Sequence, residues 1–298
     1  MILNVIIPSY RSKETIVRTI ESVRANRDFY KGDFDITVVD SSDDDTAEVV
    51  KRQGSDVNLV RLTERAYPGA ARNRGMESTK GDVICFVDAD AYADSNWLRE
   101  IHEYLDKNPD VDAVGGPVLN ANPKEGFSRL AHWCEFSGYG LHAPEGERRV
   151  QPAVNVAIRR GAFEKYGPFL ENQFGNEDVL LFHRMKQAGA KLHFVRSIVV
   201  HHRNKTKLKD IYRHQRHLGE CTGRARVLNN LPGSFLTRPG GSFLIPFIKT
   251  HFICVRLLTQ DVPEFPWFML HWWRVFRAMV EFARGFGEGA AQARREKS

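Results

Sequence analysis

The sequence has few cysteines, and their spacing matches neither metal nor disulfide motifs. Its four cysteines contain no C-x-x-C pair, so neither a zinc site nor a disulfide framework is indicated. A signal peptide is also missing, because the apolar stretch from Met1 ends at Pro8 without a basic region before it or a cleavage site after it. We therefore expect a first strand at this place and a cytoplasmic protein.

The chain is basic but lacks a recognition motif for nucleic acids. Its 43 lysines and arginines exceed its 37 aspartates and glutamates, for a net charge of +6. A positive charge favours an anionic partner, which could be nucleic acid, a phosphorylated substrate or an anionic membrane surface. Because the basic residues are dispersed along the chain, we expect no nucleic-acid partner.

Apolar runs alternate with amphipathic stretches through the first ninety residues. This alternation predicts an α/β fold with a mainly parallel central sheet. The length of 298 residues allows one such domain and an appendage. The predicted strands lie at 3–7, 36–39, 57–60, 83–87, 113–119, 151–159 and 192–200, with a turn at Phe174–Asn176 and later helices at 127–136 and 177–188.

In the stretch from Val83 to Asp90, two carboxylates, Asp88 and Asp90, follow a predicted strand whose residues are all apolar. In open α/β sheets, ligands bind at the carboxyl ends of such strands. Asp88 and Asp90 could supply oxygen ligands to Mg²⁺ or Mn²⁺, and the ion would hold a ligand's phosphates. Asp-x-Asp recurs at three other places in the chain, where a solvated turn explains it, so only its position distinguishes this pair.

Six short motifs resemble those of a known family. They are Pro8-Ser9-Tyr10, Val38-Val39-Asp40, Gly69 to Gly75, Phe86 to Asp90, Asn176-Glu177-Asp178 and Val200-His201. In this order and spacing they resemble a family 2 glycosyltransferase with a GT-A fold, over roughly residues 1 to 220. The resemblance implies a Rossmann-like sheet and the inverting transfer of a sugar from a nucleotide-diphosphate sugar to an acceptor hydroxyl. We accordingly predict a GT-A domain at 1–220 and a helical, aromatic-rich region at 221–298.

The resemblance also implies a role for individual residues. Pro8, Ser9 and Tyr10 would line the base and ribose pocket, and Asp40 would accept a hydrogen bond from the base. Arg72 would lie near the nucleotide or its phosphates, and Asp88 near the ribose and the metal ion. Asp90 and His201 would bind Mn²⁺ or Mg²⁺, with His202 as the alternative to His201, and Asp178 would be the catalytic base.

Two departures from the family pattern limit what the resemblance implies. The loop after Asp40 lacks the second acid and the glycine that many relatives have, which leaves the base specificity open. The Gln-x-x-Arg-Trp motif of processive relatives is absent after Gln215, so we predict transfer of a single sugar. Two other classes remain as alternatives: a metal-dependent phosphatase with Asp88 as nucleophile, and a nucleotidyltransferase, which would not need Asp178 or His201.

The last eighty residues are rich in aromatic side chains. The apolar run at 243–248 is followed by Lys249, and we interpret it as too short and too charged for a spanning helix of about 20 apolar residues. Further on, Arg274, Arg277, Glu281 and Arg284 share one helical face, and Trp272, Trp273, Phe276, Met279 and Val280 the other. This pattern is typical of a helix that lies on an anionic membrane. It predicts peripheral contact with the cytoplasmic face, which would suit a lipid-linked or cell-surface glycan acceptor. Packing on the first domain or on a second subunit, as in a homodimer, explains the pattern equally well.

Overall fold

The structure is a computed structural model that describes residues 1–172 and 175–297. Packing groups the chain into two compact units: Met1–Ala121 with Pro144–His202, and Asn122–Ala143 with Arg203–Ser298. We refer to them as the first and second units and describe each by itself. The domain boundary at residue 220 stays a prediction, and the predicted turn at Phe174–Asn176 lies partly outside the described residues.

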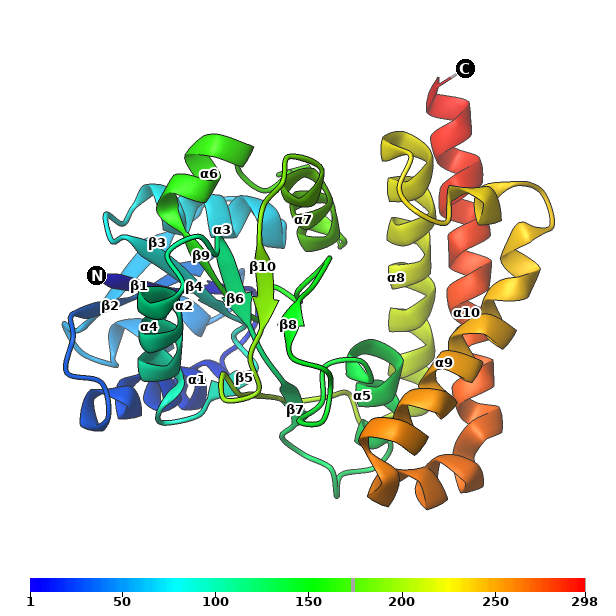
Figure 1. The fold of residues 1–298 in the computed structure, drawn as a ribbon, viewed down its shortest axis with the longest axis horizontal. Coiled ribbons are helices and arrows are strands. Elements are labelled where there is room, and N and C mark those ends of the chain that lie inside the picture. The colour runs from blue at the N-terminus through cyan, green and yellow to red at the C-terminus, as the bar shows by residue number, and fades with distance from the viewer. Residues whose placement is uncertain (173–174, 298) are drawn as a thin grey trace. The chain divides into compact units, whose positions relative to one another are not determined.

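The first unit is built on a sheet with the strand order β3-β2-β1-β4-β9-β6-β10-β8 (Figure 1). Strands β1 to β4 run parallel, β9 is antiparallel to both of its neighbours, and β10 is again parallel to β6. The strand bounds are Leu3–Ser9 (β1), Phe34–Asp40 (β2), Val57–Arg61 (β3), Val83–Val87 (β4), Ala113–Gly115 (β6), Gly146–Glu147 (β8), Asn155–Arg159 (β9) and Leu192–Phe194 (β10). The predicted α/β class with a mainly parallel sheet is confirmed.

Helices cover both faces of this sheet, with α3, α6 and α7 on one face and α1 and α4 on the other (Figure 1). Their bounds are Ile16–Arg24 (α1), Thr46–Lys51 (α2), Pro68–Glu77 (α3), Trp97–Lys107 (α4), Arg160–Tyr166 (α6) and Glu177–Gln187 (α7), with a short 3₁₀ turn, η1, at Ala25–Asp28. From β1 the chain passes to β2 and β3 and then returns to β4 on the other side of β1. Such a switch in strand order opens a crevice at the carboxyl ends of the strands, which is where ligands bind in this type of sheet.

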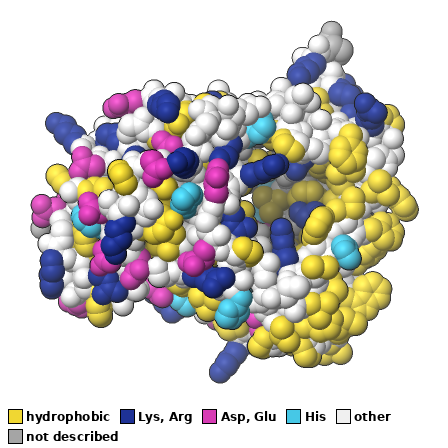
Figure 2. Space-filling model, viewed as in Figure 1, with side chains coloured by type: hydrophobic (Ala, Val, Ile, Leu, Met, Phe, Trp, Pro, Cys, Tyr) yellow, Lys and Arg dark blue, Asp and Glu magenta, His cyan; other side chains and the backbone are white. Residues whose placement is uncertain are grey.

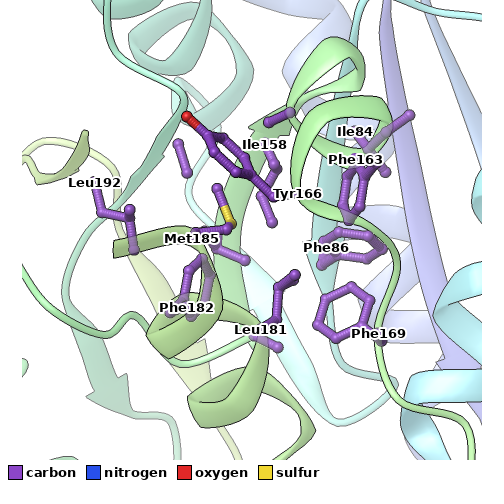
Figure 3. Packing of buried hydrophobic residues seen from close by; sticks show 14 of the residues in the cluster. Ile84, Phe86, Ile158, Phe163, Tyr166, Phe169, Leu181, Phe182, Met185 and Leu192 are labelled. Atoms are coloured by element: carbon purple, nitrogen blue, oxygen red, sulfur yellow. The ribbon is translucent and has the colours of Figure 1, made fainter. Parts of the chain in front are cut away.

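An apolar cluster holds α7 against the sheet. Every residue of β4 is buried, and the ring of Phe86 meets that of Phe169 edge-on, with centroids 5.4 Å apart (Figure 3). Leu181 and Phe182 of α7 are buried in the same cluster. The amino-terminal end of α7 is therefore fixed relative to the end of β4.

Two predicted strands are each divided in the structure. Residues 113–119 form β6 and then β7 (Val118–Asn120) in a different sheet, because Gly116 and Pro117 interrupt the strand. A Cβ atom at Gly116 would lie 2.2 Å from the carbonyl oxygen of Ile198, so only glycine allows this close approach. Residues 192–200 likewise separate into β10 and β11 (Val200–His202). The small second sheet has the order β5-β11-β7, with β5 at Ala91–Ala93.

The second unit is helical and rests on two parallel helices in close contact. Its elements are α5 (Ser128–Phe136), α8 (Leu208–Asn229), η2 (Ser234–Thr237), η3 (Gly241–Leu244), α9 (Ile245–Gln260), η4 (Val262–Glu264) and α10 (Phe265–Lys297). Helix α8 lies beside α10, and ion pairs join Arg216 to Glu288 and Arg224 to Glu296. A Cβ atom added at Gly285 would lie 1.8 Å from a carbonyl oxygen of α8, and one at Gly219 would lie 2.0 Å from a carbonyl oxygen of α10. Glycine on both helices is what lets the two backbones touch.

An apolar face of the second unit is exposed. Figure 2 shows hydrophobic side chains gathered over α9 and the start of α10. Among them, Phe243, Phe247 and Phe252 are 72%, 53% and 54% exposed, and Trp272 and Trp273 are about half exposed. Met279, predicted on the same face as the tryptophans, is instead fully buried.

The segment Gly241–Gln260 is continuously helical. Its 20 residues, of which an 18-residue stretch has a mean hydropathy of 1.4, are long and apolar enough to cross a membrane, by length and composition alone. The prediction that this region is too short and too charged for such a helix is therefore wrong.

Candidate active site

The ends of β1 and β2 bring the first predicted residues together. Ser9 pairs with Asp40 in the register of the two strands, and Pro8 precedes it within β1. The hydroxyl of Ser9 is buried and has no hydrogen-bond partner among the described residues. The ring of Tyr10 follows, with the guanidinium of Arg65 lying 4.5 Å from its centroid. A buried, unsatisfied hydroxyl at a strand end is suited to a ligand's polar group.

Asp40 is fully buried and already engaged. Its Oδ1 accepts a 2.5 Å hydrogen bond from the hydroxyl of Ser42, and its Oδ2 pairs with the guanidinium of Arg61. Arg61 stands opposite Asp40 in the register of β2 and β3, and sequence reasoning missed it because the pairing of strands is not visible in one segment. The role of Asp40 in binding a base stays a prediction.

Arg72 is a nearly fully buried charge between β4 and α7. Its side chain is 4% exposed and donates to Asp88 Oδ1 at 2.9 Å and to Glu177 Oε1 at 2.5 Å. Burial lowers the pKa of Arg72, but the carboxylates around it outweigh burial, so the pKa is raised and the guanidinium stays charged. Burial likewise raises the pKa of Asp88, an effect that Arg72 opposes. Arg72 thus joins the end of β4 to the start of α7.

Glu177 was missed as a site residue. It belongs to the motif Asn176-Glu177-Asp178, but an acid in the first turn of a helix is common because it complements the helix dipole, so no role was predicted for it. In the structure it is 6% exposed and is directed at Arg72 rather than at solvent.

Asp178, the second residue of α7, is a half-buried carboxylate that accepts hydrogen bonds from two backbone donors. The N–H of Val179 donates to its Oδ1 at 2.7 Å, and the N–H of Ala153 donates to its Oδ2 at 3.2 Å. Burial and the neighbouring Glu177 raise the pKa of Asp178 to about 6. A carboxylate with such a pKa is mostly ionised at pH 7 and is basic enough to accept a proton.

The two histidines of β11 point to different partners. Strand β11 pairs with β5 so that His202 stands opposite Ala91, and its Nε2 lies 3.4 Å from Asp90 Oδ1. The Nε2 of His201 lies 2.9 Å from Asp94 Oδ1 instead, because successive side chains of a strand point to opposite faces. The histidine beside Asp90 is therefore His202, the alternative to His201, and which of the two binds a metal ion stays a prediction.

Asp90 and His202 could together bind a divalent ion whose other ligands are oxygens of a diphosphate. Within residues 1–172 and 175–297, no group of three or more histidine, cysteine or acidic side chains is placed to hold a metal. Mg²⁺ in nucleotide sites is commonly held by one or two carboxylates together with substrate phosphates, and an imidazole ligand is better tolerated by Mn²⁺. Asp88 stands two residues before Asp90, held by Arg72.

These features define an α/β protein that gathers acidic, basic and imidazole groups at the carboxyl edge of a mainly parallel sheet. Residues 4–167 match the family model of glycosyl transferase family 2. The chain belongs to this family, as the six motifs indicated.

Comparison with curated proteins gives relatives of the same kind. Glycosyltransferase AglE of Haloferax volcanii is 29% identical over 201 residues, covering 66% of this chain and 65% of that protein. The glucosyl-dolichyl phosphate glucuronosyltransferase of the same organism is 29% identical over 182 residues, covering 58% of this chain and 57% of that protein. The matches thus span less than two thirds of the length of these relatives.

Solved structures share the fold at low sequence identity. The mannosyltransferase PcManGT from Pyrobaculum calidifontis, in complex with GDP-Man and Mn²⁺, has a TM-score of 0.63 at 17% identity and covers 99% of this chain and 88% of that chain. A fragment of S. aureus TarS in complex with UDP-GlcNAc has a TM-score of 0.57 at 16% identity, covering 99% and 92%. The predicted GT-A fold is confirmed by these neighbours.

Proposed function

We propose that this protein transfers a single sugar from a nucleotide-diphosphate sugar to an acceptor hydroxyl, with inversion at the anomeric carbon. The observation that carries the proposal is the bridge formed by buried Arg72 between Asp88 and Glu177. It connects the strand end that leads to Asp90 with the first turn of α7, which contains Asp178. The same site then contains a candidate base for the attacking hydroxyl, Asp178, and a candidate metal ligand on the side of the leaving diphosphate, Asp90.

The reaction needs a base on the acceptor side of the sugar and stabilisation of negative charge on the diphosphate side. The hydroxyl of the acceptor forms a bond to the anomeric carbon while the bond from that carbon to the diphosphate oxygen breaks. Asp178 takes the acceptor's proton, and general-base assistance of this kind contributes on the order of 10² to 10⁴ in rate. A divalent ion bound by Asp90 and His202 would stabilise the charge that develops on the diphosphate. A single displacement inverts the configuration and needs no covalent nucleophile.

The ribose and base would lie along the ends of β1 and β2. The unsatisfied hydroxyl of Ser9 and the exposed part of the ring of Tyr10 are available to them. Asp88 would meet the ribose, with Arg72 holding its carboxylate in place. Asp40 would contact the base only if its bonds to Arg61 or Ser42 rearrange.

A lipid-linked acceptor at a membrane surface is part of the proposal. The name of the glucuronosyltransferase relative describes a glucosyl-dolichyl phosphate substrate, which makes this acceptor class a reasonable one for the present chain. The exposed aromatic side chains of α9 and α10 supply a face for peripheral contact with the cytoplasmic leaflet. The alternative is that this face is buried in the interface of a homodimer.

The activity is tested with a panel of UDP-, GDP- and dTDP-linked sugars, with and without Mn²⁺ or Mg²⁺. We expect one donor to bind in a metal-dependent way, Asp90→Ala to lose this binding, and Asp94→Ala, which removes a carboxylate at the other end of β5, to retain it. Asp178→Asn should bind the donor but transfer the sugar 10²- to 10⁴-fold more slowly, roughly the contribution of a general base. Cleavage of a phosphomonoester that depends on Asp88, without binding of any nucleotide sugar, would instead support the phosphatase alternative.

The membrane contact is tested by flotation with vesicles of phosphatidylglycerol and phosphatidylcholine. Replacing both Phe247 and Phe252 by serine should reduce the bound fraction. Phe29→Ser, which removes a similarly exposed phenylalanine from the first unit, should leave it unchanged. Recovery of the wild-type protein wholly in the soluble fraction at low salt without detergent would contradict the proposal.

A further inference from the structure

A cavity of about 300 Å³ lies in the second unit, where the carboxyl ends of α8 and α10 meet η2. Three arginines line it: Arg226 from α8, Arg238 from the residue after η2, and Arg294 from α10. The hydroxyl-bearing residues Ser234 and Thr237 lie between them. All of the lining residues are described, and none of them is an aspartate or a glutamate.

Two of the lining arginines, Arg226 and Arg294, differ from the paired arginines Arg216 and Arg224 of α8, which form ion pairs with glutamates of α10. Arg226 donates to a backbone carbonyl of its own helix at 3.5 Å and lies over the ring of Phe286, 5.8 Å from its centroid. Arg294 donates to the backbone carbonyl of Thr237. For the side chain of Arg238, no partner occurs among the described residues. Three guanidinium charges therefore converge without a carboxylate to balance them.

The ends of the helices do not account for this charge. The carbonyl groups at the end of a helix carry partial negative charge and attract cations. At the end of α8 this role is already filled by Lys297, whose Nζ bonds to the carbonyls of Val227 and Leu228 at 2.8 and 3.3 Å. Burial also lowers the pKa of Arg226, as expected for a cation removed from water without an anion beside it.

We propose that this cavity binds a phosphate group. Guanidinium groups bind phosphate oxygens through paired hydrogen bonds, and hydroxyl groups add further donors. The volume is at the lower end of the range of small-molecule sites, which is about 300 to 1,000 Å³. A phosphate monoester or an anionic headgroup fits both the charge and the size of the cavity.

The charge of the whole unit favours a phosphate presented by a lipid. The second unit has 19 lysines and arginines against nine acidic residues, a net charge of +10, whereas the first unit has 24 against 28, a net charge of −4. Phe235, which lines the cavity, is 62% exposed. A basic cavity with an aromatic side chain at its rim is suited to a headgroup at a membrane surface. The cavity shares no residue with the candidate active site, so either proposal can fail without the other.

The test compares two sources of phosphate on the full chain. Soluble phosphate is supplied as inorganic phosphate and pyrophosphate in calorimetric titrations, and lipid phosphate as vesicles of phosphatidylcholine with phosphatidic acid. Arg238→Gln removes one charged donor that has no partner within residues 1–172 and 175–297, and it should weaken binding about tenfold. Arg213→Gln removes the same charge from an exposed position on α8 and should change binding less than twofold. Arg238→Lys, which keeps the charge but loses the paired geometry, should have an intermediate effect.

The outcomes show whether the phosphate comes from a lipid or from solution, and whether the cavity binds it at all. Saturable binding to vesicles alone, weakened by Arg238→Gln, identifies a lipid headgroup, and binding of the soluble anions with the same response identifies a free phosphate. Equal weakening by Arg238→Gln and Arg213→Gln would show that only the overall charge matters and would overturn the proposal. The proposal also fails if the wild-type protein binds none of these probes in a saturable way.

Discussion

Replacing the buried Arg72 should reveal a strong coupling with Glu177. In Arg72→Met, the carboxylate of Glu177 stays buried but loses the guanidinium that lies 2.5 Å away. In Glu177→Gln, Arg72 keeps its ion pair with Asp88. The double variant Arg72→Met/Glu177→Gln removes both charges and leaves a methionine beside a neutral amide.

The expected magnitudes follow from the exposure of the two side chains, which is 4% and 8%. Removing one partner of a buried ion pair costs about 3 to 5 kcal/mol, because the other charge remains without a counter-ion. We expect a loss of this size for Arg72→Met and a smaller one for Glu177→Gln. The double variant should be less destabilised than the sum of the single variants by at least about 2 kcal/mol.

The coupling is measured by native-state hydrogen exchange of the β4 amides, which reports on the first unit alone. Arg74 and Glu77 form the matched control, since they lie on the same helix α3 as Arg72, with atoms 2.8 Å apart and side chains 50% and 55% exposed. The corresponding cycle at this exposed pair should give a coupling of about 0 to 1 kcal/mol. If the Arg72 and Glu177 changes add like the control pair, the bridge does not hold α7 to the strand end.

Four further predictions concern other residues of the chain. Gly285→Ala should lower the free energy of unfolding by about 1 to 3 kcal/mol, because its Cβ would lie 1.8 Å from a carbonyl oxygen of α8. Thermal melts measure this loss of stability. Gly287→Ala is the control: its Cβ would meet nothing closer than 3.5 Å, so this variant should be neutral or stabilising. The transfer rate should fall as the pH drops through about 6, where Asp178 takes up a proton, and a rate independent of pH between 5 and 8 would contradict its role as base. Because folding raises the pKa of Asp178 above its usual 3.8, its ionisation costs stability as the pH rises from about 4 to 6. Asp178→Asn should therefore stabilise the protein above pH 6 and have little effect near pH 4. His202→Ala should weaken metal-dependent donor binding, whereas His201→Ala should not, as calorimetry can show.

The parts of the fold that could be predicted are those whose signal is local. Strands β1, β2 and β4 are apolar runs with both faces buried, so their composition alone indicates them. The division of 113–119 at Gly116 could not be predicted, because its cause is the backbone of Ile198, far along the chain. The division of a predicted strand between two different sheets likewise depends on packing between distant segments, which one segment of sequence does not reveal.

The candidate site shows the same limit. Asp88 and Asp90 could be placed because they end an apolar strand. The choice between His201 and His202 depends on the pairing of β11 with β5, and a shift of one residue would reverse it. Glu177 acquires its role from Arg72, which is 105 residues away.

The glycine contact between α8 and α10 restricts how α9 can meet a bilayer. Helix α9 runs back along α10, since Ile245 at its start packs with Phe286 and Leu257 near its end packs with Phe268. Its two ends therefore pack against two well-separated turns of α10. If α9 spanned the lipid in this arrangement, the ion pairs between Arg216 and Glu288 and between Arg224 and Glu296 would have to enter with it. If the protein meets a membrane as proposed, we therefore expect α9 to lie along the membrane surface while α8 and α10 stay joined.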